Sequence, residues 1–213
     1  MDFTRSEFLH LCGPEGYQEP FGEGYDYRDE IEVVLEAHRD ANGRCLEIGC
    51  GNGYWTLQFL APRFRDVLAL DLLPPPPLFE GHAKIRYVQV AVGDTSCAGI
   101  EDGSIDFVWS FGVFCHLSNS SVEGYLRSIH RVLRPGGQAL LMFPNWDRYR
   151  QLAPAGSLDG VDLEDVEQYR EKPLGTWFYC DLPTAKRQVL EAGFREFEDT
   201  LPAFRDTLAR VRK

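Results

Sequence analysis

Short apolar runs alternate with segments whose apolar positions recur at helical spacing along most of this chain. Five apolar runs predict strands at residues 44–48, 67–71, 85–92, 105–111 and 138–143. Two further runs, at residues 194–199 and 207–211, predict two last strands near the C-terminus. Strands that alternate with helices indicate a parallel, doubly wound sheet. We therefore expect an α/β fold built on a sheet of about seven strands.

Helical spacing first appears ahead of these strands. A helix that begins at Arg28 should end at Asn42-Gly43, because this pair is a common stop signal. Its apolar stripe consists of Ile31, Val34, Leu35 and His38. A second helix is expected over residues 54–61, where Pro62 stops it.

Two more helices carry clear end signals. Ser120 and Glu123 form a capping box ahead of a long apolar stripe, and residues 135–137, Pro-Gly-Gly, should end that helix. The last helix opens at Asp181 and ends at Gly193.

Three segments do not follow the alternation. Residues 1–27 are rich in glycine, glutamate and aromatic residues and are expected to form an irregular N-terminal arm. Residues 145–180 contain many acids and predict an inserted, partly helical cap. Four prolines at residues 74–77 predict a rigid extended loop, because proline forbids both helix and ladder. We expect a single domain over residues 1–213, with the arm and the cap on its substrate side.

The charge balance argues against a polyanionic partner. The chain has 22 Lys and Arg residues against 33 Asp and Glu residues, a formal net charge of −11. Affinity for nucleic acid comes mainly from neutralised phosphates, and the chain has no run of basic residues. We therefore expect no nucleic acid among its partners. We also expect no membrane partner, because no segment has 18 consecutive apolar residues.

The cysteines point to a reducing compartment. The N-terminus lacks the basic-then-apolar order of a secretory signal. No cysteine belongs to a Cys-x-x-Cys pair, which argues against structural zinc. The simplest interpretation is a reduced, cytoplasmic protein. The six cysteines are Cys12, Cys45, Cys50, Cys97, Cys115 and Cys180.

The clearest chemical signal follows the strand at residues 44–48. Gly49, Gly51 and Gly53 stand at alternate positions and let a ligand approach the backbone without meeting a Cβ. The helix that follows adds free amide N–H groups, which suit a carboxylate as well as a phosphate. The spacing differs from the Gly-x-Gly-x-x-Gly of dinucleotide sites. The alternative is a merely tight turn between strand and helix.

Two acids stand at the ends of later strands. Asp71 lies 18 residues beyond Gly53, where a carboxylate can accept hydrogen bonds from both hydroxyls of a ribose. Asp94, after Gly93, is placed where it could accept from the exocyclic amine of an adenine. Asp71 could instead be a solvated strand-end acid, and Asp94 an ordinary turn aspartate.

With these residues in view, the chain resembles the class I S-adenosylmethionine-dependent methyltransferases. Five landmarks carry the resemblance in order: LEIGCGNGYWT (46–56), ALDLLP (69–74), GD (93–94), SIDFVWSFGVFCHL (104–117) and VLRPGGQALLMFP (132–144). The resemblance implies a Rossmann-like sheet, mostly parallel, with an antiparallel strand in its C-terminal hairpin. It also implies S-adenosyl-L-methionine as cofactor and S-adenosyl-L-homocysteine as product.

The resemblance assigns roles to individual positions. Asp71 would hold the ribose with Leu72 beside the adenine, Asp94 would meet the adenine amine, and Ser110 would flank the sulfonium. Four positions would line the methionine moiety: Glu47, Gly49, Gly51 and Gly53. The chain departs from many members in the proline run after Asp71 and at Gly112.

His116 is the candidate base, because it follows a strand at the carboxyl edge and an imidazole titrates near neutral pH. The alternative is a structural or pocket-lining histidine. We expect no metal, because Phe-Gly-Val-Phe at residues 111–114 puts no acid after the fourth strand, and Asn145 and Asp147 alone offer too few oxygens.

Aromatic residues of the arm and the cap are candidates for binding a small organic substrate. The residues singled out are Tyr17, Tyr25, Trp146 and Tyr179. Methyl transfer to an O, N or S nucleophile of a small metabolite is the leading hypothesis. The second is an enzyme that binds the same cofactor but does non-methylating chemistry on it, such as cyclisation or elimination. The third is a binding protein with a degenerate site, against which the intact glycine loop argues.

Overall fold

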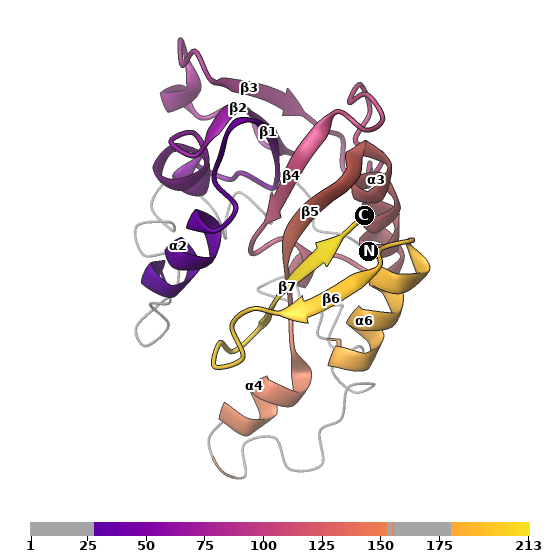
Figure 1. The fold of residues 1–213 in the computed structure, drawn as a ribbon. Coiled ribbons are helices and arrows are strands. Elements are labelled where there is room, and N and C mark those ends of the chain that lie inside the picture. Colours follow the sequence, from indigo (N-terminus) through magenta and orange to yellow (C-terminus); the bar gives the residue numbers. More distant parts are fainter. Residues whose placement is uncertain (1–27, 153–154, 156–179) are drawn as a thin grey trace.

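The structure is a computed structural model, and it describes residues 28–152, residue 155 and residues 180–213 (Figure 1). Seven strands form a single sheet in the order β3-β2-β1-β4-β5-β7-β6. The strands are β1 (Asp40–Ile48), β2 (Phe64–Asp71), β3 (Ile85–Gln89), β4 (Ile105–Ser110), β5 (Leu133–Phe143), β6 (Glu196–Asp199) and β7 (Thr207–Arg212). The expected number of strands is confirmed.

Strand directions follow the doubly wound pattern. β3, β2, β1, β4 and β5 pair in parallel, whereas β7 runs antiparallel to both β5 and β6. The mostly parallel sheet with an antiparallel C-terminal strand is therefore confirmed. The strand order reverses between β1 and β4, which is where ligands bind in open α/β sheets. The loops after β1, β2 and β4 border this point.

Helices cover both faces of the sheet. Figure 1 shows α2 (Arg28–Glu36) on one face and α3 (Asn119–Val132) with α6 (Leu182–Glu191) on the other. Four shorter elements complete the description: η1 (Thr56–Leu60), η2 (Pro77–Phe79), η3 (Phe114–His116) and α4 (Trp146–Leu152). No helix in the described ranges is both long and apolar enough to cross a membrane.

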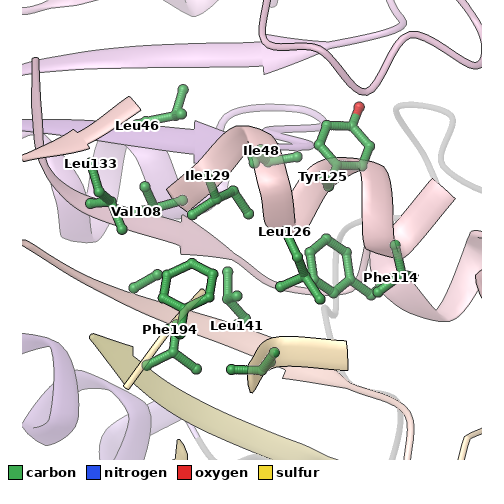
Figure 2. Close-up of a cluster of buried hydrophobic side chains, with 14 of the residues drawn as sticks. Leu46, Ile48, Val108, Phe114, Tyr125, Leu126, Ile129, Leu133, Leu141 and Phe194 are labelled. Carbon is green, nitrogen blue, oxygen red and sulfur yellow. The ribbon is translucent and has the colours of Figure 1, made fainter. Parts of the chain in front are cut away.

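Two apolar cores lie against the two faces. Figure 2 shows the core beneath α3, in which Leu126 and Ile129 lie close to Ile48, Val108 and other strand residues. The second core packs α2 and η1 against the opposite face. Alternate residues of each central strand point to opposite faces, so both faces of β1 and β4 are buried.

Two helix ends differ from their expected positions. α2 ends at Glu36, and Asn42-Gly43 lies inside β1, whose register shifts between Asp40 and Arg44. There the Asn42 amide donates to the Asp40 carboxylate at 3.0 Å. The Asn-Gly signal therefore marks an irregular strand start, because a local Asp–amide hydrogen bond forms there instead of a helix cap.

The start of α3 also differs. Ser118, not Ser120, is the N-cap, and its Oγ accepts from the Ser121 amide at 3.3 Å. The predicted Ser120–Glu123 capping box is therefore wrong, because the helix begins two residues earlier than the box requires. The helix ends at Val132, and the Pro-Gly-Gly segment at residues 135–137 already belongs to β5.

The expected helix over residues 54–61 is present but irregular. Tyr54 and Trp55 are α-helical, and the chain then widens into the π-helical η1. β2 begins at Phe64, directly after Pro62 has ended this turn. β3 ends at Gln89 instead of residue 92, which frees the residues after it to line the site described below.

Candidate functional site

The glycine loop after β1 turns sharply over the end of β2. The amides of Gly49 and Cys50 both donate to the Leu70 carbonyl, at 2.8 and 3.1 Å. Gly49 has a φ of 72°, and a Cβ there would lie 2.2 Å from Val113 Cγ2. Only glycine fits this position, because both the backbone conformation and the close approach of Val113 exclude a side chain.

The proline run after Asp71 has a packing role at the same loop. It leads into η2, which places the Phe79 ring against Gly53. A Cβ on Gly53, whose φ is 86°, would lie 2.5 Å from Phe79 Cε1. The departure from the family pattern thus supplies an aromatic side chain that covers the last glycine of the loop.

Asp71 is held as an oriented acceptor at the end of β2. Its side chain is 4% exposed; Oδ2 accepts from the Gly51 amide at 2.7 Å and Oδ1 from the Leu73 amide at 3.0 Å. Burial raises the pKa of Asp71, while the amides of Leu73, Gly51 and Leu72 oppose that rise. Each carboxylate oxygen retains capacity for a further donor, such as a ribose hydroxyl.

A pocket opens beside this carboxylate at the carboxyl edge of the sheet. It is lined by five of the residues singled out in the sequence: Gly49, Asp71, Leu72, Asp94 and His116. Its remaining walls are mostly apolar and include Val90, Val92, Val113, Leu117 and Tyr125. The pocket therefore combines apolar walls with a few convergent polar groups, as is usual for small-molecule sites.

Several of these wall residues carry no site signal in the sequence. The apolar run at residues 85–92 predicts that Val90 and Val92 belong to the third strand, but β3 ends at Gln89 and both valines line the pocket. Val92 is 53% exposed, so it offers an apolar wall open to a ligand. Tyr125 belongs to the apolar stripe of α3, and helical periodicity alone cannot separate a pocket residue from a core residue.

Asp94 stabilises a local turn, as expected if it is an ordinary turn aspartate. Its Oδ1 accepts from the Ser96 amide at 2.8 Å and from Ser96 Oγ at 2.6 Å, and these hydrogen bonds lower its pKa. Both bonds use Oδ1, and Asp94 also lines the pocket. The turn and the ligand role are therefore compatible, because Oδ2 can face the pocket.

His116 ends η3 and lies on the pocket wall. Burial lowers its pKa to about 4, because a charged imidazole loses its hydration there. The side chain is therefore neutral at physiological pH. A neutral imidazole can accept a proton or a hydrogen bond, but it is a weaker base than a free histidine.

Glu47 and Ser110 lie beside the pocket without being among its lining residues. Glu47 is 1% exposed and accepts a hydrogen bond from Thr56 Oγ1. Burial, with a smaller contribution from the nearby Asp71, raises its pKa to about 8, although the hydrogen bond from Thr56 opposes the rise. Ser110 Oγ donates to the Ile48 carbonyl at 3.3 Å. Gly51 acts through its amide on Asp71, and Gly53 through its contact with Phe79.

Trp146, a predicted substrate residue, is buried at the start of α4. Its ring stacks on Tyr149 with a centroid separation of 5.8 Å, and its amide donates to the Cys180 carbonyl at 3.0 Å. Trp146 does not line the described pocket. The other substrate candidates, Tyr17, Tyr25 and Tyr179, lie outside the described residues.

The base of the predicted cap is fixed to the C-terminal hairpin. Arg148 of α4 donates to the carbonyls of Phe204 and Asp206, at 3.1 and 2.8 Å, and pairs with Asp199. Asn145 Nδ2 donates to Thr207 Oγ1 at 2.8 Å. These contacts hold the chain after β5 against β7, so Asn145 has a packing role at this position.

The described residues fit an adenosyl ligand in three respects. Asp71 offers a fixed acceptor for vicinal hydroxyls, and Leu72 and Val92 offer apolar walls for a flat base. Asp94 supplies an acceptor further along the same pocket. The described ranges contain no group of three or more His, Cys, Asp or Glu residues suited to a metal ion.

The chain matches the model of the family described as "Methyltransferase domain" over residues 18–195. It is 32% identical over 180 residues to a probable S-adenosylmethionine-dependent methyltransferase of Mycolicibacterium smegmatis, covering 83% of this chain and 61% of that protein. It is 29% identical over 167 residues to a tRNA U34 carboxymethyltransferase of Methylococcus capsulatus, covering 73% and 46% respectively. The chain thus spans 61% and 46% of the lengths of these two relatives.

A solved structure shares the fold. The 1,6-didemethyltoxoflavin-N1-methyltransferase of Burkholderia thailandensis, with 1,6-didemethyltoxoflavin and S-adenosylhomocysteine bound, superposes with a TM-score of 0.67 at 19% identity. The match covers 98% of this chain and 86% of that one. At this identity the likeness shows the fold alone. The family match over most of the chain and the five sequence landmarks show that this chain belongs to the methyltransferase-domain family, of the class I S-adenosylmethionine-dependent type.

Proposed function

We propose that this protein transfers the methyl group of S-adenosyl-L-methionine to an O, N or S nucleophile of a small organic molecule. The observation that carries the proposal is the Asp71 carboxylate, which two backbone amides orient at the edge of an apolar pocket. This arrangement lies where the strand order reverses. It suits a ligand with a ribose and a flat base.

The reaction would be a direct displacement. When bound, the cofactor supplies an activated methyl group whose sulfur loses its positive charge as the methyl departs. The chain's own residues then bind and orient: Asp71 fixes the ribose, Leu72 and Val92 hold the base, and the glycine loop lets the amino-acid end approach the backbone. Positioning of this kind can supply much of the acceleration without a strong acid or base.

His116 is the candidate for moving a proton. It lies on the pocket wall and is neutral at physiological pH, so its imidazole can accept a proton from a hydroxyl or amine acceptor. An acceptor that is already anionic requires no such step. His116 would then only shape the pocket.

The acceptor we propose is a small molecule and not tRNA, although a relative is named for tRNA modification. The net charge of −11 opposes binding to a polyanion. At the same edge of the sheet, the half-buried rings of Tyr54 and Phe111 join Trp55, and the Trp55 and Phe111 centroids lie 5.1 Å apart. Such a wall favours an apolar or aromatic acceptor, to which Tyr17, Tyr25 and Tyr179 would add from the arm and the cap.

Calorimetry with S-adenosylhomocysteine tests the cofactor site. The wild type should bind one equivalent and should not bind NAD. Asp71→Ala should weaken binding about 10-fold or more, because a charge-assisted hydrogen bond contributes roughly 1.5–3 kcal/mol. Asp29→Ala, at an exposed acid of α2, is the matched control and should bind as the wild type does. Absence of binding at millimolar ligand would refute the proposal.

Product analysis with labelled cofactor tests the chemistry. Methyl transfer should release S-adenosylhomocysteine only when an acceptor is present, and excess EDTA should not reduce the rate. Release of methylthioadenosine from the cofactor alone would instead support elimination within the cofactor. Activity on total tRNA that exceeds activity on small aromatic acceptors would contradict the proposed substrate class. The five cysteines of the described ranges are all buried as thiols, which fits a cytoplasmic enzyme.

A further inference from the structure

The segment between β3 and β4 is fastened to α3 at two places. In Figure 2 the Tyr125 hydroxyl points away from the apolar core, and it donates to the Asp94 carbonyl at 3.3 Å. Further along the helix, the Arg131 guanidinium donates to the carbonyls of Ser96 and Ile100, at 2.9 and 3.0 Å. The position of Asp94 therefore depends on the helix, although Asp94 itself belongs to the loop.

Gly124 allows the loop to approach the helix closely. It lies inside α3, where alanine would be the better helix former. A Cβ on Gly124 would overlap Thr95 Oγ1 and would lie 3.1 Å from Thr95 Cβ. Glycine at this position thus lets Thr95, the residue after Asp94, pack directly against the helix.

This contact between loop and helix forms part of the pocket wall. Asp94, Thr95, Ser121 and Tyr125 all line the pocket. The Ser96 amide and hydroxyl both donate to Asp94 Oδ1 and lower the pKa of Asp94, so the carboxylate is ionised at neutral pH and can offer Oδ2 to a ligand. A carboxylate accepts hydrogen bonds and cannot donate one. It therefore favours a base with an exocyclic amine over a base with a carbonyl group at the same position.

We propose that Tyr125 and Gly124 of α3 are positioning residues for recognition of the base, holding the Asp94 turn where its carboxylate selects adenine over hypoxanthine. This inference rests on the proposed function, which places the base of the cofactor in this pocket, with Asp94 as the acceptor for its amine. Tyr125 acts through its hydroxyl and Gly124 through its lack of a side chain. A hydrogen bond weakens steeply when its geometry is disturbed, so a small displacement of the turn reduces selectivity while the protein stays folded.

Calorimetry with S-adenosylhomocysteine and S-inosylhomocysteine measures this selectivity, because their bases carry an exocyclic amine and a carbonyl group, respectively. The wild type should bind the adenosyl ligand about 10-fold or more tightly, since the inosyl ligand loses a hydrogen bond to a charged group. Tyr125→Phe keeps the ring in the pocket wall and should lower this preference several-fold, with little change in affinity for the inosyl ligand. Gly124→Ala should lower the preference as well, because its Cβ displaces Thr95.

Thr95→Ala provides a rescue of the second variant. It removes the hydroxyl that a Cβ on Gly124 would overlap, so the double variant Gly124→Ala/Thr95→Ala should regain most of the preference that Gly124→Ala loses. A general loss of helix stability would not be restored in this way. Arg127→Ala, at an exposed position of the same helix, is the matched control and should keep the wild-type preference.

Asp94→Asn separates this inference from the proposed function. An amide can donate to a carbonyl group as well as accept from an amine, so the preference should collapse in this variant if Asp94 contacts the base. A wild type without preference, or a preference unchanged in Asp94→Asn, would refute the proposed placement of the base. A preference that collapses in Asp94→Asn but survives in Tyr125→Phe and Gly124→Ala would overturn the inference, as would a loss in Gly124→Ala that Thr95→Ala does not restore.

Discussion

Burial sets the protonation of the acids and bases at this site more than partner charges do. Burial raises the pKa of Glu47 to about 8 and lowers the pKa of His116 to about 4. Both side chains are therefore mainly neutral near pH 7 without a ligand. Their neutrality matters for mechanism, because these two side chains offer hydrogen bonds in place of fixed charges, unlike the oriented Asp71 carboxylate.

His116 provides the test at this scale. His116→Ala should reduce turnover on a hydroxyl acceptor about 10²–10⁴-fold, because the acceptor's proton then lacks a base. Affinity for S-adenosylhomocysteine should remain nearly unchanged. Because the pKa is lowered to about 4, the wild-type rate should fall only as the pH drops below about 5. Steady-state kinetics from pH 4 to 9 measure both effects.

A flat profile at neutral pH does not by itself exclude a base, since the imidazole stays neutral over that range. His116→Gln decides between the two roles, because an amide can donate and accept hydrogen bonds but cannot take up a proton. Near-normal turnover in His116→Gln would show that the side chain only shapes the pocket. Positioning would then remain as the source of catalysis.

Local hydrogen bonds and close side-chain contacts determine where individual elements begin and end. α3 starts at Ser118 because its hydroxyl reaches the Ser121 amide, although Ser120 and Glu123 have the spacing of a capping box. The glycine loop is equally specific, since Phe79 packs directly against Gly53. The cap and the glycine contact can each be tested by comparing a substitution at that position with one at a matched control residue.

The helix start predicts a difference between two neighbouring serines. Ser118→Ala should lower the free energy of unfolding by about 1 kcal/mol, because an amide of the first turn of α3 loses its acceptor. Ser120→Ala, inside the helix and exposed, should change it by less than about 0.5 kcal/mol. Urea denaturation of the two variants measures the difference. Equal destabilisation would contradict the assignment of Ser118 as the cap.

The glycine loop predicts a difference between two glycines of positive φ. Gly53→Ala should destabilise the protein and weaken cofactor binding, because its Cβ would overlap the Phe79 ring at 2.5 Å. Gly81 has a similar φ of 72°, but a Cβ at this position would lie more than 4 Å from any neighbouring atom. Gly81→Ala should therefore show only the cost of backbone strain, on the order of 1 kcal/mol. Thermal unfolding and calorimetry together separate the clash from the strain.

Over the whole molecule, histidines whose pKa is lowered by folding link stability to acidity. His38 stacks on Phe107 with a centroid distance of 5.0 Å, and burial together with Arg210 lowers its pKa to about 4. The unfolded chain binds protons at its histidines near pH 6.5, whereas the folded chain resists them until about pH 4. Folding stability from this source is therefore full above pH 6.5 and is lost as the pH falls toward 4.

This linkage predicts a pH-dependent difference between the wild type and His38→Phe. His38 is only half-buried, so solvent screens part of the effect, and the wild type should lose on the order of 1 kcal/mol between pH 7 and 4 that the variant does not lose. Denaturant midpoints at several pH values measure the loss relative to the variant. Glu47 has the opposite effect, because its raised pKa makes the folded protein more stable as the pH falls from 8 to 4.5. The variant shares this contribution with the wild type, so only their difference reports on His38.

Much of the fold and part of the site were predictable from the sequence. The strand–helix alternation and the C-terminal pattern predicted the seven-stranded sheet, because periodicity is a local property of the chain. Gly49, Asp71 and Asp94 were found because loops after parallel strands gather at one edge. Their roles toward a cofactor remain proposals.

Tertiary structure decided what depends on contacts between distant segments. Val92 became a pocket wall and not a strand residue, and Phe79 reached Gly53 only through the path of the proline loop. The protonation of Glu47 and His116 was also decided there, because burial depends on every element packed around a side chain. Sequence spacing sets which residues can meet at an edge, whereas desolvation and packing arise only when the whole chain has folded around them.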